Sequence, residues 1–210
     1  MLKKTPGPIH LNFPFKEPLL PNNLQKITVP TFTFNKIKKT TTNFSIPLLN
    51  RSNQPIIIVG PMEENQQQQI IIQLAEKIKA PIFADPLSQI RYHSKNKHIL
   101  SNYDLFLRFN EIEPTLIIRF GRKPTSKILN QLLDNYKTIT VLIDTWEQFN
   151  DDCPQFIQST IAEYCKHQIS QCNWEGEKKW LNQFLDLEKQ VTNIIKSNAT
   201  FSEGEIGRTC

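Results

Sequence analysis

Apolar and polar positions through the middle of the chain follow the pattern of a parallel α/β protein. Residues 55–59 form a continuous, largely β-branched run, which is typical of a strand buried on both faces of a sheet. Apolar side chains then recur at helical spacing over residues 63–79, and residues 81–84 resume the strand pattern. This order predicts a strand–helix–strand unit.

The same alternation continues toward the C-terminus. Further strands are predicted at residues 104–108, 115–120, 138–144 and 167–172, and helices at about 124–135, 154–167 and 175–197. Strands that alternate with helices favour parallel pairing. We therefore predict the α/β class, with a doubly wound, mainly parallel sheet flanked by helices.

The N-terminal quarter has a different pattern. Ile9, Leu11 and Phe13 alternate with polar residues as in a half-buried strand, and the prolines that follow end it. Residues 21–53 are rich in Thr, Asn, Lys and Pro without clear periodicity, which predicts an extended linker. The lead strand is therefore expected to be separate from the compact body.

Composition narrows the class of protein. The 210 residues, 39% of them hydrophobic, suffice for one well-cored domain with appendages. No apolar run approaches the roughly 20 residues of a membrane helix, and no signal-peptide core is present, so a soluble intracellular protein is expected. The four cysteines have no paired spacing, which argues against a zinc site.

Positive charge is concentrated between Arg91 and Lys127. This window holds eight basic and three acidic residues, so it carries the whole formal surplus of +5. Several of these residues follow predicted strands, at the edge where open α/β sheets bind ligands. The pattern favours an acidic ligand. Nucleic acid is a competing interpretation that lacks a recognition motif, and a solvated rim is the simplest one.

Motifs of common enzyme classes are absent. The turn Val59-Gly60-Pro61 lacks the later glycines of a dinucleotide fingerprint, and no phosphate-binding loop, nucleophile elbow or HExxH helix occurs. We therefore predict no catalytic, cofactor-binding or metal-binding residue in this chain.

A candidate anion site lies in the turn after residues 115–120. Pro124 suits the first turn of the next helix, and free N–H groups at a helix start attract anions. Ser126 can donate a hydrogen bond to a carboxylate, and Lys127 adds a positive charge. Together with Arg122 in the same turn, these are the predicted substrate-binding residues.

Three stretches resemble the thiamine-diphosphate enzymes of the MenD family. Residues 7–19, with Gly-Pro-Ile-His-Leu-Asn and Glu-Pro-Leu, are similar to the end of that family's pyrimidine-binding domain. Residues 84–91 (Ala-Asp-Pro-Leu-Ser and Arg91) resemble a stretch of its middle domain. Residues 118–121 with Pro124, Ser126 and Lys127 resemble its middle-domain strand and loop.

The resemblance implies a function. The family joins decarboxylated 2-oxoglutarate to isochorismate in menaquinone and phylloquinone biosynthesis, using thiamine diphosphate and Mg²⁺, and its lysine at the place of Lys127 helps to bind acidic substrate. The activating glutamate and the Gly-Asp-Gly metal motif of its other domains do not occur here. This chain alone is therefore expected to bind no cofactor and to be inactive.

The resemblance also implies a division of the chain and its surroundings. The pyrimidine- and diphosphate-binding domains are expected as partners, in a homo-oligomeric enzyme of the bacterial cytoplasm or plastid stroma, with no nucleic acid or membrane. The expected parts are the terminal strand of the pyrimidine-binding domain (1–20), a linker (21–53), the central α/β domain (54–190), and a linker helix with the start of the diphosphate-binding domain (191–210).

Two alternatives stay open at this point. The chain is also compatible with a non-catalytic binding or oligomerisation module for an acidic metabolite. It is further compatible with the middle domain of another thiamine-diphosphate family, such as the acetolactate synthases, although their flavin- or nucleotide-contacting motifs are not apparent.

Overall fold

The computed structural model describes residues 49–62, 67–93, 95–145 and 153–197, together with Asn12 and Asp151. Apart from Asn12, these residues belong to one compact unit, residues 44–210. The predicted lead strand at 7–19, most of the linker at 21–53 and the C-terminal stretch at 198–210 lie outside the described residues.

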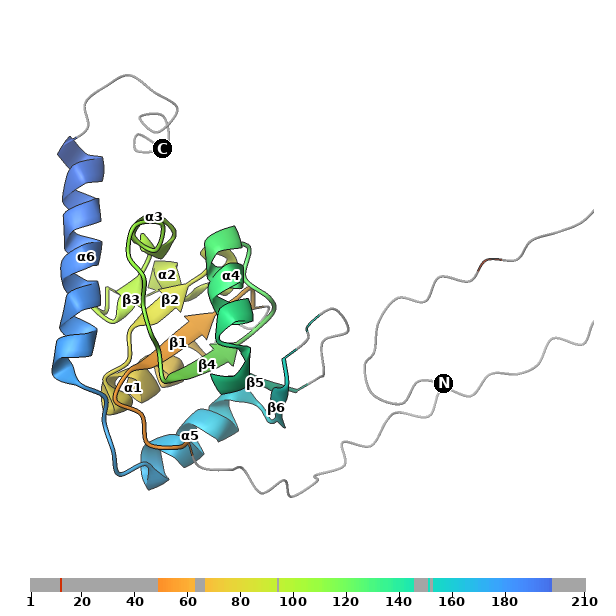
Figure 1. The fold of residues 1–210 in the computed structure, drawn as a ribbon. Coiled ribbons are helices and arrows are strands. Elements are labelled where there is room, and N and C mark those ends of the chain that lie inside the picture. Colours follow the sequence, from red (N-terminus) through yellow and green to blue (C-terminus); the bar gives the residue numbers. More distant parts are fainter. Residues whose placement is uncertain are drawn as a thin grey trace, which may run out of the picture. The chain divides into compact units, whose positions relative to one another are not determined.

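Six parallel strands form one sheet in this part of the chain, in the order β3-β2-β1-β4-β5-β6 (Figure 1). The strands are β1 (Pro55–Val59), β2 (Ile82–Ala84), β3 (Ile99–Leu100), β4 (Leu116–Phe120), β5 (Thr140–Asp144) and β6 (Gln155–Gln158). The chain winds outward from β1 first toward β3 and then toward β6, so the order reverses between β1 and β4. The predicted doubly wound α/β fold is confirmed.

Helices cover both faces of the sheet (Figure 1). The described helices are α1 (Gln68–Ile78), α2 (Ile90–His93), α3 (Tyr103–Phe106), α4 (Lys127–Asn135), α5 (Ile161–Gln171) and α6 (Lys178–Ser197), with 3₁₀ helices η1 (Pro86–Ser88) and η2 (Lys137–Ile139). The short helices η1, α2, α3 and η2 lie in the connections between strands.

The strict alternation of side chains along β1 builds two cores. Ile57 and Val59 pack with α1 and α5 on one face, and Ile56 and Ile58 pack with α3, α4 and α6 on the other. All four side chains are fully buried, as expected for a strand in the middle of a parallel sheet.

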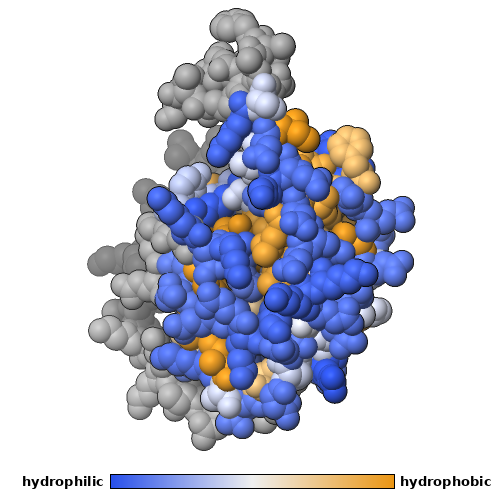
Figure 2. Space-filling view, turned by 90° about the vertical axis from the view of Figure 1, so that its left-hand side faces the viewer, coloured by the Kyte–Doolittle hydropathy of each residue, from blue (hydrophilic) through white to orange (hydrophobic). Residues whose placement is uncertain are grey.

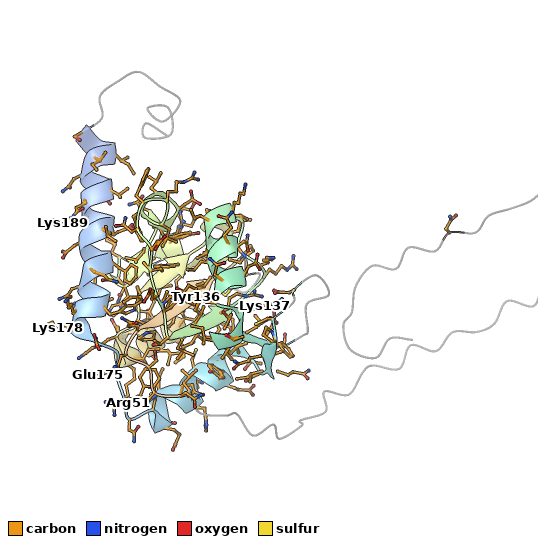
Figure 3. All side chains as sticks on the ribbon, viewed as in Figure 1. Arg51, Tyr136, Lys137, Glu175, Lys178 and Lys189 are labelled. Carbon is orange, nitrogen blue, oxygen red and sulfur yellow. The ribbon has the colours of Figure 1, made fainter. Side chains whose placement is uncertain are left out.

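Aromatic side chains hold the long helix α6 against the sheet. The Trp180 indole N–H donates to the Pro55 carbonyl at 3.0 Å, and the Trp180 and Phe184 rings meet edge to face with centroids 4.9 Å apart. Lys178 and Lys189 lie exposed on the opposite side of the helix and point away from the sheet (Figure 3). Helix α6 continues without a break past the predicted domain boundary at residue 190.

The predicted strand at residues 104–108 is wrong, because Tyr103–Phe106 forms helix α3. Tyr103 and Phe106 lie three residues apart and are both buried in the same core, a spacing that only a helix allows. Arg108 forms an ion pair with Asp104 one turn earlier, at 2.7 Å. The strand of this crossover is β3, which is only two residues long.

Two predictions near the C-terminus are also wrong. Residues 155–158 form strand β6 instead of the start of a helix, and the helix begins only after Thr160. The Thr160 hydroxyl accepts the Glu163 N–H at 3.2 Å, which starts α5 at this point. Helix α5 then runs to Gln171, so no strand forms at 167–172.

No helix in the described residues is long and apolar enough to span a membrane.

Candidate functional site

The candidate site lies at the carboxyl edge of the sheet, where the loops after β1 and β4 meet. The Gly60 N–H donates to the Phe120 carbonyl at 2.9 Å, and the Arg122 N–H donates to the Pro61 carbonyl at 3.0 Å. A Cβ on Gly60 would lie 1.8 Å from the Arg122 oxygen, so only glycine fits there. Gly121 has φ +75°, a left-handed conformation that also favours glycine. Backbone hydrogen bonds therefore join the loops after β1 and β4, at the place where the strand order reverses.

Asp85 connects this edge to the loop after β2. Its side chain is fully buried and accepts the Leu87 N–H at 2.9 Å through one oxygen. The other oxygen accepts the Thr125 N–H at 2.7 Å and the Thr125 hydroxyl at 2.8 Å. Asp85 thereby caps η1 and also ties η1 to the segment that precedes α4.

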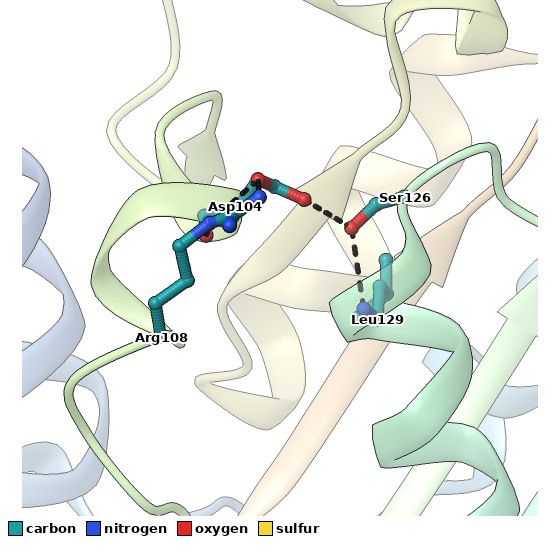
Figure 4. Close-up of polar contacts among 4 residues, drawn as sticks. All are labelled: Asp104, Arg108, Ser126 and Leu129. Atoms are coloured by element: carbon teal, nitrogen blue, oxygen red, sulfur yellow. Dashed lines mark hydrogen bonds and ion pairs between the residues drawn. The ribbon is translucent and has the colours of Figure 1, made fainter.

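Ser126 is the N-cap of α4 (Figure 4). Its hydroxyl oxygen accepts the Leu129 N–H at 3.2 Å, and its hydroxyl hydrogen is donated to Asp104 at 2.5 Å. The hydrogen bond from Ser126, followed by the hydrogen bond from Arg108, holds the pKa of Asp104 below its usual value. The start of α4 is thus bound by two carboxyl groups of the protein itself, Asp85 and Asp104.

The structure brings the three predicted site residues onto one loop. Lys127 is the first residue of α4, and its exposed side chain makes no hydrogen bond or ion pair with the described residues. Arg122 is exposed in the same loop. Pro124 lies two residues before the N-cap, so its prediction in the first helical turn is wrong. Substrate binding by Lys127, Ser126 and Arg122 stays a prediction.

Two other basic residues of the window have internal partners. The Arg91 Nε–H donates to the Ala84 carbonyl at 2.6 Å, and its guanidinium lies 5.7 Å from the centre of the Tyr103 ring. Arg119 is buried on β4 and forms an ion pair with Asp151. Burial lowers the pKa of Arg119. The basic character of the edge therefore comes mainly from the remaining exposed residues.

Sequence reasoning missed the role of Asp104 because residues 104–108 were assigned to a strand. The hydrogen bonds between Asp85 and Thr125, forty positions apart, were not predicted either. The Asp-Pro pair is a local signal for a turn at Asp85, but it does not point to Thr125. Nothing local in the sequence marks Asp104.

The sequence of this chain is similar to those of known thiamine-diphosphate enzymes. A family model described as "Middle domain of thiamine pyrophosphate" matches residues 35–209. The 2-succinyl-5-enolpyruvyl-6-hydroxy-3-cyclohexene-1-carboxylate synthase of Staphylococcus saprophyticus is 33% identical over 202 residues, which cover 91% of this chain and 35% of that protein.

Two further proteins with the same name are similar to this chain. The one from Listeria monocytogenes serovar 1/2a is 34% identical over 95% of this chain and 40% of its own length. The one from Bacillus cytotoxicus is 27% identical over 95% of this chain and 38% of its own length. The chain thus spans well under half of these relatives, and the predicted resemblance to MenD synthases is confirmed. Since the family model matches most of its residues, this chain belongs to the family of thiamine pyrophosphate middle domains.

Proposed function

We propose that this chain is the central domain of a thiamine-diphosphate-dependent synthase of the MenD type. Such an enzyme joins decarboxylated 2-oxoglutarate to isochorismate in menaquinone or phylloquinone biosynthesis. The observation that carries the proposal is the similarity, over 91% of this chain, to a synthase of that name. Because the chain spans 35% of that relative, the chain alone is proposed to be inactive.

The cofactor is assigned to other parts of the enzyme. Thiamine diphosphate is held through Mg²⁺, which prefers carboxylate and other oxygen ligands. Among the described residues, no group of three or more His, Cys, Asp or Glu is arranged to hold a metal ion. The described residues therefore offer no such set of ligands for Mg²⁺, and the proposal gives this domain a role in substrate binding and assembly.

Lys127 is proposed to bind a carboxylate of the acidic substrate, with Arg122 as a second positive charge and Ser126 in the same site. The support is geometric, since the exposed Lys127 ammonium lies on a loop fixed to two other segments by Thr125 and Ser126. A loop fixed in this way presents its lysine with little entropic cost on binding. The Ser126 hydroxyl already donates to Asp104, so its part in the site is to cap the helix that begins at Lys127.

Exposed hydrophobic side chains support docking of this edge to the rest of the enzyme, which we propose is a homo-oligomer. Five large ones are exposed in the described residues: Leu87, Tyr92, Leu105, Phe109 and Ile194. The first four follow β2 and β3 and so lie toward the carboxyl edge, and the fifth lies near the end of α6. On the face that α6 covers, hydrophobic side chains gather mainly toward the end where α3 lies (Figure 2). Such a patch is typical of an interface.

Steady-state kinetics of the complete synthase with Lys127→Ala tests the substrate role. Loss of a charged contact to a carboxylate costs about 1.5–3 kcal/mol, so the apparent KM for the acidic substrate should rise about tenfold or more. Lys123→Ala is the matched control, because Lys123 is an exposed lysine of the same loop. An unchanged KM in Lys127→Ala, or equal increases in both variants, contradicts the assignment.

A second test uses this chain without the rest of the enzyme. We expect no thiamine-diphosphate-dependent consumption of isochorismate, because the chain spans only 35% of the synthase it resembles. Turnover by the isolated chain would contradict the proposal that the other domains bind the cofactor.

The alternative of a binding module is favoured by the same exposed Lys127. In that case this chain alone would bind a dicarboxylate without chemistry. Calorimetry with 2-oxoglutarate distinguishes the two, since saturable heat that Lys127→Ala abolishes supports the module, and no heat supports a site completed by other domains.

A further inference from the structure

Asp85 has a role that its position after β2 does not explain. The carboxyl group is fully buried and accepts three hydrogen bonds from two segments far apart in the sequence: the Leu87 N–H, the Thr125 N–H and the Thr125 hydroxyl. A cap for η1 requires only the first of these. The two bonds from Thr125 bind the loop that leads into α4.

We propose that Asp85 is a positioning residue that fixes the Lys127 loop through Thr125. The inference rests on the proposed substrate role of Lys127. Thr125 lies two residues before Lys127, directly before the N-cap of α4. The Thr125 N–H and hydroxyl donate to the same carboxyl oxygen of Asp85, at 2.7 and 2.8 Å. This oxygen therefore fixes the backbone at Thr125, where the chain enters α4.

Asp85 also links the loop to the central strands. The Asp85 N–H donates to the Val59 carbonyl at 2.9 Å, at the end of β1. The Met62 N–H donates to the Leu87 carbonyl at 3.2 Å, so the loop after β1 is held by the same turn. The Lys127 loop is therefore connected through Asp85 to β1, a fully buried strand in the middle of the sheet.

Asp85 and Asp104 both accept hydrogen bonds from the loop before α4, but they differ in burial. Asp104, which accepts from Ser126, has a side chain that is 38% exposed, and water competes for its hydrogen bonds. Asp85 is 0% exposed and accepts two hydrogen bonds from Thr125, so water does not compete for its carboxyl oxygens even though Thr125 itself is exposed. Asp85 is thus the stronger of the two restraints on the loop.

The first test measures the restraint directly, without substrate. In Asp85→Ala the Thr125 N–H and hydroxyl both lose their acceptor, so amide hydrogen exchange at Thr125 should become about tenfold faster or more. Exchange at Ile118, inside β4, should stay unchanged. Unchanged exchange at Thr125 in a folded variant overturns the proposal.

A milder variant covers the case in which Asp85→Ala fails to fold. Thr125→Val removes the hydroxyl and keeps the N–H bond to Asp85, so it should fold and give a smaller increase in exchange at Ser126 and Lys127. Thr125→Ser keeps both bonds and is the matched control. Equal exchange in the valine and serine variants overturns the proposal.

The second test asks whether Asp85 acts through Lys127 in the complete synthase. Thr125→Val should raise the apparent KM for the acidic substrate about threefold with kcat nearly unchanged, whereas Thr125→Ser should not. Added to Lys127→Ala, Thr125→Val should have no further effect on KM, because the group it positions is gone. Additive effects of the two changes overturn the positioning role.

The two tests separate this inference from the proposed function. An unchanged KM in Lys127→Ala removes the substrate role, whatever the exchange rates are. A raised KM in Lys127→Ala together with additive Thr125→Val effects keeps the substrate role and removes only the positioning by Asp85.

Discussion

Helices α4 and α5 both begin with a hydroxyl N-cap after a parallel strand, but they are fixed in different ways. At α5 the Thr160 hydroxyl accepts the Glu163 N–H at 3.2 Å and donates to the Glu163 carboxylate at 2.7 Å. This is a capping arrangement within one turn. At α4 the Ser126 hydroxyl also accepts a helix N–H, but it donates to Asp104, which belongs to α3.

The difference shows which helix start depends on the rest of the fold. The side-chain cap of α5 lies within its own first four residues, Thr160 to Glu163. The start of α4 is bound to α3 through Asp104 and to the turn after β2 through Asp85, so side-chain hydrogen bonds join three connections at the carboxyl edge. The exposed basic residues of the candidate site lie on this second kind of helix start, where distant contacts can hold a loop in one position.

The largest expected effect comes from breaking the contact between the loops after β1 and β4. In Gly60→Ala the new Cβ would lie 1.8 Å from the Arg122 oxygen, so the two loops must separate. We expect a loss of about 3 kcal/mol in the free energy of unfolding, measured by urea titration. Ser159→Ala, in the loop before α5, should stay within about 0.5 kcal/mol of the unchanged protein. Similar losses in both variants would remove the contrast between the two loops.

Removing each N-cap should have the next largest effect. Ser126→Ala leaves the Leu129 N–H without its cap and takes a hydrogen bond from Asp104, so we expect about 2 kcal/mol lower stability. Thr160→Ala loses a local cap at an exposed helix start and should cost about 1 kcal/mol. Urea titrations of the two variants make the comparison. A larger loss for Thr160→Ala would contradict the view that α4 has the more extensive restraints.

The same contrast explains what the sequence could and could not predict. The buried strands β1, β4 and β5 were predicted because each contains a run of at least three consecutive apolar, mostly β-branched or leucine residues, which suits a strand covered on both faces. Helices α1, α4 and α6 were predicted because their apolar residues recur every three or four positions.

The wrong predictions fall where short segments carry mixed signals. Residues 103–106 contain enough apolar side chains for a strand, and only the burial of Tyr103 and Phe106 on one side makes them helical. Strand β6 has exposed glutamines at both ends, so it lacks the pattern of a buried strand. The capping box at Thr160 and Glu163 was a readable local signal for the true start of α5.

The candidate site was predicted in part for the same reason. Lys127 and Arg122 were found from charge and from their place after a strand, which are local features. Asp85 and Thr125 are 40 positions apart, and Asp104 and Ser126 are 22 positions apart. No local sequence pattern predicts hydrogen bonds between residues so far apart.

The pH dependence of Asp104 gives a smaller effect that reports on the α4 cap. Hydrogen bonds from Ser126 and Arg108 hold the pKa of Asp104 below the ordinary value of 3.8. The contribution to stability is present above that ordinary value and is lost as pH falls through the lower folded-state pKa. In Ser126→Ala the pKa of Asp104 should move back toward 3.8, as measured by NMR titration of its carboxyl carbon. No movement would mean that Ser126 does not stabilise the charged form.

The smallest expected effect is at the cap of α5. Glu163→Gln keeps an acceptor for the Thr160 hydroxyl and removes only a negative charge from the first turn of an exposed helix, so we expect about 0.3 kcal/mol lower stability. Asp104→Asn is the matched change at α4, and it should cost more because the ion pair with Arg108 and the restraint on Ser126 weaken together. Added salt should reduce the loss in Glu163→Gln nearly to zero, since exposed charges are screened. If Glu163→Gln proves as costly as Asp104→Asn, then α5 also depends on contacts beyond its own first turn.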